Sequence, residues 1–111
     1  ALLTFESDED KYGYVKLDAE ENVIGTAEKV VVSNDAICGA YYCRNADLFK
    51  SAVEKYLQQC AYKEFFLSGV YNVMADEGKK LIRFRTDFHV PYGVPEEYEI
   101  AKESERFKEL L

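Results

Sequence analysis

Short apolar runs separated by acidic or polar turns fill the first part of the chain, and this pattern is typical of strands. Residues 12–17 alternate between apolar and polar positions, and a charged turn leads from them into residues 23–27. These two runs are predicted to form a hairpin that is exposed on one face. Gly39 lies inside a later run and predicts a bulge, or the close approach of a ligand or backbone. The predicted strands are residues 1–5, 12–17, 23–27, 30–32 and 37–43.

From residue 46 onward the apolar positions follow the period of a helix. The stripe over residues 46–60 predicts a helix with one buried face, and Asn45 is its predicted N-cap because an Asn side chain can accept a bond from a free backbone N–H. The remaining predicted elements are a helix over about 64–77 that stops at Gly78, a strand over 81–90, and a last helix that begins at Pro95 with Glu96 and Glu97 near its positive end.

Strands followed by two helices, a strand and a helix indicate an α/β or α+β layer structure. The chain has 111 residues, which is the length of one domain. Hydrophobic residues make up 48% and charged residues 32%, and this balance excludes a disordered chain. No apolar stretch approaches the ~18 residues of a membrane helix, so no membrane partner is expected.

The charge balance narrows the classes of partner. Fourteen Lys and Arg stand against 21 Asp and Glu, giving a net charge of −7, and such a field repels the phosphate backbone of nucleic acids. A small phosphorylated ligand held by one or two local cations stays open. The three cysteines form no C-x-x-C pair, which indicates reduced thiols in a cytoplasmic protein. Because the chain begins at Ala1 with an apolar run, we expect it to be a segment of a longer protein.

Few residues stand out as candidates for chemistry. Glu28 and Lys29 follow a predicted strand, where the Lys cation can neutralise a phosphate and the carboxylate can accept hydrogen bonds from hydroxyls; the alternative is a solvated pair. Gly39 can bring a bare backbone against a ligand, or serve only in packing. Glu64 opens a predicted helix, where a carboxylate either binds a ligand or complements the helix dipole.

Three other charged or titratable residues receive plainer interpretations. Arg83 and Arg85 share a strand face and are expected to form a surface stripe, with phosphate contact as the alternative. His89 is the only histidine, and it has no nucleophile at a recognisable spacing, so a structural role is favoured over a catalytic triad. The sequence has no Gly-rich phosphate loop of either standard type.

Taken in order, several short motifs resemble the C-terminal half of a sugar-1-phosphate nucleotidyltransferase, and the bacterial branch that makes activated sugars for capsules and other surface glycans is the most similar. The resemblance spans roughly residues 1–100. The motifs are Tyr12-x-Tyr14-Val15-x-Leu17-Asp18, Val23 through Glu28-Lys29, Ser33-Asn34-x-Ala36-x-x-Gly39-x-Tyr41-Tyr42, Glu64-Phe65-Phe66-Leu67-Ser68-x-Val70-Tyr71-Asn72 and Gly93-x-Pro95-Glu96-Glu97.

The resemblance implies a fold, a reaction and a set of site residues. It implies a portion of a Rossmann-like, three-layer α/β domain with a mixed sheet, flanking helices and, in the whole family domain, mostly parallel strands. It also implies that a sugar 1-phosphate reacts with a nucleoside triphosphate, with magnesium, to give a nucleotide sugar and pyrophosphate. By the same resemblance Lys29 holds the sugar's phosphate, Glu28 contacts sugar hydroxyls, and Gly39 and Glu64 lie near the sugar.

The sequence also departs from the family pattern. The Gly-rich triphosphate loop and the first magnesium-binding Asp belong to the N-terminal half, which is absent from residues 1–111. Pro91 stands where many members have a second metal-binding Asp, so no metal ligand is assigned. Two alternatives to a catalytic segment follow: a non-catalytic module for sugar phosphates or nucleotide sugars, and an acidic interaction domain. A shortened sheet exposes an edge, so we also expect a homodimer.

Overall fold

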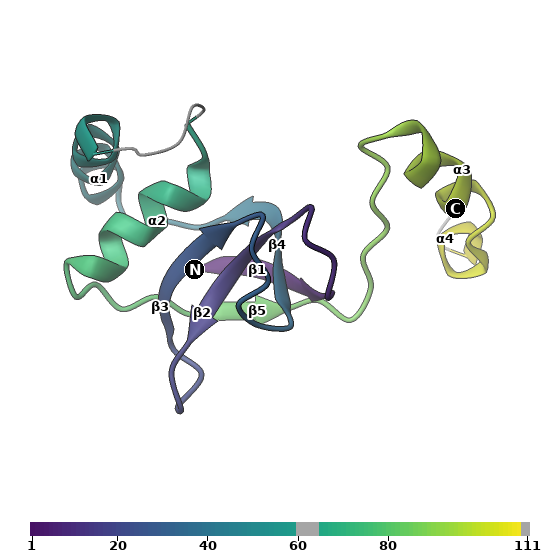
Figure 1. Cartoon of the computed structure of the whole chain (residues 1–111), viewed down its shortest axis with the longest axis horizontal. Helices are drawn as coiled ribbons and strands as arrows, with labels where there is room; N and C mark the ends of the chain where they lie inside the picture. The colour runs from purple at the N-terminus through teal and green to yellow at the C-terminus, as the bar shows by residue number, and fades with distance from the viewer. Residues whose placement is uncertain (60–64, 110–111) are drawn as a thin grey trace.

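The structure is a computed structural model that describes residues 1–59 and 65–109, apart from the side chain of residue 107. A five-stranded sheet with strand order β3-β2-β4-β1-β5 occupies its centre (Figure 1). No helix in these described ranges is both long and apolar enough to cross a bilayer. The elements are β1 (Leu2–Glu6), β2 (Gly13–Leu17), β3 (Val23–Glu28), β4 (Asp35–Tyr41), α1 (Ala46–Gln59), α2 (Leu67–Asp76), β5 (Arg83–Arg85), α3 (Pro95–Lys102) and α4 (Glu105–Glu109).

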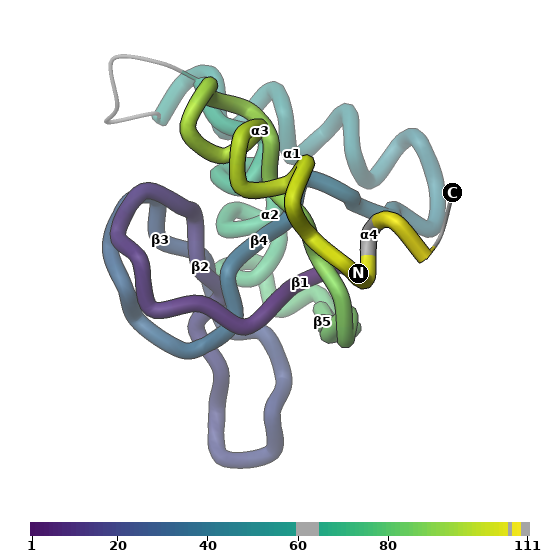
Figure 2. Tube along the Cα trace, turned by 90° about the vertical axis from the view of Figure 1, so that its right-hand side faces the viewer, coloured from purple at the N-terminus to yellow at the C-terminus, as the bar shows by residue number. Residues whose placement is uncertain are grey.

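The sheet is mixed, as expected. β2 pairs antiparallel with both β3 and β4, and β4 pairs antiparallel with β1. β5 is parallel to β1, and this is the one parallel pairing within the part of the chain that the structure describes. The mostly parallel sheet implied for the whole family domain is therefore not a feature of these residues. The predicted β2–β3 hairpin is confirmed, and its turn projects away from the other elements in both views (Figures 1 and 2).

The main core lies between one face of the sheet and helices α1 and α2 (Figure 1). Gly69 of α2 lets the two helices approach, because a Cβ at this position would lie 2.2 Å from the Tyr56 ring. The predicted Asn45 cap is confirmed by a 2.9 Å bond from the Leu48 N–H to its Oδ1. The sheet contributes Leu2, Val15, Val23 and Ile37, and the helical side contributes Ala52, Tyr56, Val70, Tyr71, Met74 and Leu81.

A smaller cluster covers the opposite face of the sheet. It consists of Phe5, Tyr14 and Ala36, with Tyr12 and Cys38 packed at its margin. His89 stacks on Phe5 with ring centroids 3.9 Å apart, which agrees with the structural role predicted for this histidine. Burial lowers the pKa of His89.

Two predicted strands differ from the structure. The strand at 30–32 was a wrong prediction: Lys29 has a φ of 59°, which turns the chain out of the sheet, and the three valines are 39–55% exposed. A β-branched run does not make a strand without a partner. The strand at 81–90 is confirmed only for Arg83–Arg85. It ends where the Thr86 hydroxyl bonds to the backbone of Phe88, which satisfies these groups locally.

Arg83 and Arg85 share one face of β5, where Arg85 is exposed and Arg83 is half-buried, and a carboxylate that the sequence did not indicate holds both. Both guanidinium groups contact the buried Asp35: Arg85 donates from Nε and Nη2 at 3.0 and 2.9 Å, and the Arg83 Nε lies 3.1 Å from Oδ1. The Arg83 N–H is not aligned for a hydrogen bond, so that contact is an ion pair only. The Thr4 hydroxyl donates to the same carboxylate at 3.0 Å. This Asp35 clamp joins β4, β1 and β5.

Candidate functional site

The carboxyl ends of β3 and β4 meet at one edge of the sheet, because both strands run antiparallel to β2 between them. Glu28 is the last residue of β3, and Gly39 lies near the end of β4. Open sheets in α/β proteins commonly bind their ligands beyond the carboxyl ends of strands. This edge therefore brings two of the predicted site residues to one side of the sheet.

The Glu28 side chain is held in place from α2. Ser68, which is buried, donates its hydroxyl to Glu28 Oε2 at 3.0 Å, and the Thr26 hydroxyl donates to the Ser68 carbonyl at 2.8 Å. Thr26 and Glu28 both face α2 because side chains alternate along a strand. A Cβ at position 13 would lie 2.6 Å from Glu28 Oε2, so Gly13 leaves room for the carboxylate.

Among the described residues, only one of the two Glu28 carboxylate oxygens has a hydrogen-bond partner. Within the described ranges, no hydrogen bond is made to its Oε1. Tyr41 lies nearby and stacks on Tyr71 with centroids 5.0 Å apart. Burial, followed by the negative charge of Glu28, raises the pKa of Tyr41 to about 12. Tyr41 therefore stays a neutral hydroxyl at physiological pH beside a carboxylate that can accept another hydrogen bond.

Lys29 is exposed and lies directly after β3 in a left-handed backbone conformation. Its N–H donates to the Tyr12 carbonyl at 3.0 Å, which fixes the backbone while the side chain extends outward. No carboxylate among the described residues forms an ion pair with it, so its charge is available to an anion. A ligand that this ammonium holds would bind at the open surface.

The structure tests the prediction for Gly39 but not the prediction for Glu64. Gly39 has a φ of 93°, and the pairing of β1 with β4 shifts register here, so the predicted bulge is confirmed. A Cβ at this position would meet no atom within 4 Å, and the space beside the backbone is open to a ligand. Glu64 lies outside the described residues.

Sequence reasoning did not assign Ser68 to the site, and it placed Glu97 only near the positive end of the last helix. Both stood in the motifs that carry the resemblance, and this was the signal that could have found them. Glu97 accepts hydrogen bonds from Lys11 at 2.9 Å, from the Tyr12 hydroxyl at 3.0 Å and from the Gly93 N–H at 3.2 Å. The Lys11 bond, together with that of Tyr12, lowers the pKa of Glu97. Glu97 thereby links α3 to Tyr12, and the Tyr12 carbonyl accepts the hydrogen bond from the Lys29 N–H.

Comparison with solved structures finds the same arrangement of elements in a larger protein. One similar structure is a nucleoside-diphosphate-sugar pyrophosphorylase from Vibrio cholerae, with a TM-score of 0.80 and 24% sequence identity over 89% of this chain. This chain has the fold of part of that protein. It covers 44% of the length of the pyrophosphorylase, and at this identity the likeness shows the fold alone. No protein-family model matches the sequence, and no curated protein sequence matches it.

The described residues form no candidate metal centre. Across residues 1–59 and 65–109, no three His, Cys, Asp or Glu side chains gather closely enough to hold a metal ion. Cys38 and Cys43 are free thiols, in agreement with the prediction of reduced cysteines, and Cys60 lies outside the described residues. We therefore assign no magnesium ligand among the residues that the structure describes.

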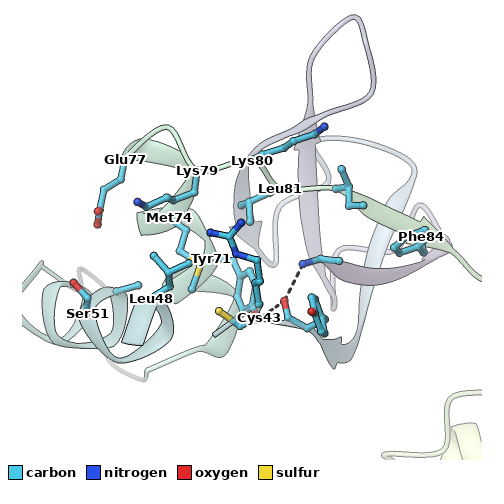
Figure 3. A pocket seen from close by; sticks show the side chains of 15 residues that line it. Cys43, Leu48, Ser51, Tyr71, Met74, Glu77, Lys79, Lys80, Leu81 and Phe84 are labelled. Carbon is cyan, nitrogen blue, oxygen red and sulfur yellow. Dashed lines mark hydrogen bonds between the residues drawn. The ribbon is translucent and has the colours of Figure 1, made fainter. Parts of the chain in front are cut away.

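The structure also has a cleft of about 630 Å³, which Figure 3 shows from close by. It is bordered by α1, by α2 and by the segment that leads into β5. Glu28, Lys29 and Gly39 are not among the residues that line it. The structure therefore presents two separate surfaces that could bind a ligand: the open edge beside Glu28 and this cleft.

Proposed function

We propose that this chain is the sugar-phosphate-binding part of a nucleotidyltransferase, which joins a sugar 1-phosphate to a nucleoside triphosphate. The fold shared with a nucleoside-diphosphate-sugar pyrophosphorylase supports the general role. The observation that carries the proposal is the pair at the end of β3. Among the described residues, Lys29 is a cation without an ion-pair partner, and Glu28 has one oxygen held by Ser68 and no hydrogen bond to the other. An anion and a neighbouring hydroxyl are the groups that this pair fits.

In the proposed reaction a phosphate oxygen of the sugar 1-phosphate attacks the α-phosphorus of the triphosphate. A new P–O bond forms, the bond to the β-phosphate breaks, and pyrophosphate leaves. Lys29 offsets the negative charge of the sugar's phosphate, and Glu28 accepts hydrogen bonds from sugar hydroxyls. Gly39 leaves space beside the sugar, and Glu64 is proposed to lie near it. Catalysis of this kind comes from positioning and charge stabilisation.

Several parts of the proposal depend on residues other than those described. Magnesium would neutralise phosphate charge in such a reaction, but we assign none of its ligands to this chain, because the described side chains form no group of three ligands. The nucleotide is proposed to bind to an N-terminal half of the parent protein. We further propose that the nucleotide sugar is made in the cytoplasm and is used for a bacterial surface glycan.

Binding by this chain tests the proposed site directly. In a titration followed by NMR, hexose 1-phosphates are expected to shift the amides of Glu28 and Lys29, whereas the free hexoses shift them much less. Lys29→Ala should weaken binding at least about tenfold, because a hydrogen bond to a charged group contributes roughly 1.5–3 kcal/mol. Lys16→Ala is the matched control, since this exposed lysine also lacks a described ion pair. Equal weakening by both variants would remove Lys29 from the site.

Turnover distinguishes catalysis from the second candidate, a non-catalytic binding module, which Pro91 in the place of a metal-binding Asp favours. In the full parent protein, Lys29→Ala is expected to lower pyrophosphate release on the order of 100-fold. Binding that needs no magnesium, in a parent protein that releases no pyrophosphate, would instead establish the binding module.

A further inference from the structure

The cleft between α1, α2 and the segment before β5 is a second surface that could hold a small molecule (Figure 3). Its volume of about 630 Å³ falls within the usual range of ligand pockets, roughly 300–1,000 Å³. Figure 3 shows Leu48 of α1 beside Met74 and Tyr71 of α2, with Lys79 at the rim over Met74. Backbone and side chains from elements far apart in the sequence therefore shape one concavity.

The floor of the cleft is apolar. Leu48 and Met74 carry no hydrogen-bonding group, and the Tyr71 hydroxyl already donates to the Tyr42 carbonyl at 3.1 Å. A sugar laid on this floor would leave its hydroxyls without partners, and an unpaired polar group is costly to bury. The floor therefore favours an aromatic or aliphatic body over a carbohydrate.

The rim carries positive charge, although the chain as a whole has a net charge of −7. Arg44 and Lys79 line the cleft, and neither forms an ion pair with a carboxylate in the described part of the chain. Lys80 also lines it but points away from Lys79 and Met74 (Figure 3). The one carboxylate at the rim, Glu77, is already paired with Lys55 at 3.0 Å. The unpaired charge that faces a ligand is thus cationic.

We propose that this cleft binds a small organic anion, with its apolar body on Leu48, Met74 and Tyr71 and its phosphate or carboxylate on Arg44 and Lys79. The guanidinium of Arg44 can bind such a group through two parallel hydrogen bonds, and Lys79 adds a point charge. This site differs from the Glu28 edge in its residues and in the class of ligand, so either can fail without the other.

Four probes separate the two halves of the proposed ligand. 1-Naphthyl phosphate and 1-naphthoate carry both an apolar body and an anion, 1-naphthol lacks the charge, and inorganic phosphate lacks the body. In ¹⁵N-resolved NMR titrations of the chain, the first two are expected to shift amides around Arg44, Leu48, Met74 and Lys79. The other two should bind at least tenfold more weakly. Equal affinity for 1-naphthol would overturn the anion requirement, and shifts outside the cleft would overturn the site.

Charge-matched double variants test the two cations. Arg44→Gln with Lys79→Gln should weaken binding of 1-naphthyl phosphate at least tenfold. The control is Lys16→Gln with Lys50→Gln, which removes the same charge from exposed lysines that do not line the cleft, and less than a twofold change is expected. Melting temperatures measured alongside verify that both proteins are folded. Equal loss in the two double variants would show that net charge, and not the cleft, governs binding.

Discussion

Lys29 both turns the backbone out of the sheet and places an ammonium group at the end of β3. Its φ of 59° is unfavourable for a residue with a Cβ, at a cost of roughly 1–2 kcal/mol, whereas glycine adopts this conformation freely. The Tyr12 carbonyl, which accepts a hydrogen bond from the Lys29 N–H, holds the backbone there. A strained residue at a candidate site is consistent with a requirement for its side chain.

Two substitutions separate this strain from the charge. Lys29→Gly and Lys29→Ala both remove the ammonium, but only glycine relieves the backbone. We expect the free energy of unfolding of the glycine variant to exceed that of the alanine variant by about 1 kcal/mol. Urea denaturation with a common m-value measures the difference. If the alanine variant were at least as stable as the glycine variant, the conclusion that the backbone at position 29 is strained would be contradicted.

At this scale the sequence indicated some residues of the site but not their partners. Glu28, Lys29 and the bulge at Gly39 could be named from local patterns and from the resemblance. The bond from Ser68 to Glu28 could not be predicted, because it forms only when α2 docks on β3 and these residues lie 40 positions apart. The left-handed backbone at Lys29 has no local signal, since lysine rarely adopts it.

Among the elements, β1, β4 and β5 depend on the Asp35 clamp. Burial by itself raises the pKa of Asp35, but the hydrogen bonds from Arg85 and Thr4 and the charge of Arg83 outweigh it, so this pKa lies below its ordinary value. A lowered pKa means that the carboxylate stabilises the fold above pH ~4 and that this contribution is lost as pH falls through the folded-state pKa.

Asp35→Asn tests the clamp. At pH 7 the variant should lose about 3 kcal/mol of unfolding free energy, because breaking a buried ion pair leaves its partners uncompensated. Below pH ~4 the difference from the unsubstituted protein should shrink, as the carboxyl of Asp35 becomes protonated. Urea denaturation at pH 7 and pH 3 measures both values. Asp76→Asn, at an exposed position without a described ion pair, is the control. If the variant and the unsubstituted protein differed by the same unfolding free energy at both pH values, the lowered pKa of Asp35 would be contradicted.

The boundaries of an element could be predicted where the apolar positions repeat clearly with the helical period. The stripe over 46–60 predicted the start of α1 and its buried face, because this apolar face packs directly on the core; residue 60 lies outside the described residues. The three valines at 30–32 are β-branched and favour a strand, but no strand among the described residues pairs with them. Strand propensity describes the preference of a single residue. Whether a strand forms also depends on whether the rest of the fold leaves a backbone edge with which it can pair.

The whole molecule has an edge that invites association. β5 pairs with β1 on one side and with no strand of the described chain on the other, and the neighbouring Phe84 and Ile82 are 59% and 38% exposed. We predict that the chain forms dimers through this edge, since open edges and apolar side chains promote pairing. Sedimentation velocity over a wide concentration range measures this, with Phe84→Lys expected to restore the monomer. A sample that stays monomeric at every concentration would contradict the prediction.

The mixed sheet with flanking helices was predictable at this scale through the resemblance. Its curvature was not: the Leu81 carbonyl accepts from the Val23 N–H at 3.0 Å and the Ile82 carbonyl from the Leu2 N–H at 3.1 Å. The segment before β5 thus contacts strands from distant places in the strand order. Such contacts depend on the twist accumulated over the sheet, which no local window of sequence contains.

The turn between β2 and β3 offers a practical use. Asp18 binds the N–H groups of Glu20 and Asn22, both at 2.9 Å, so the turn is held by its own bonds. Ala19 is exposed and takes no part in them. A fluorophore attached at this position would sit at the far end of β3 from Glu28, so the label would leave access to the carboxylate free.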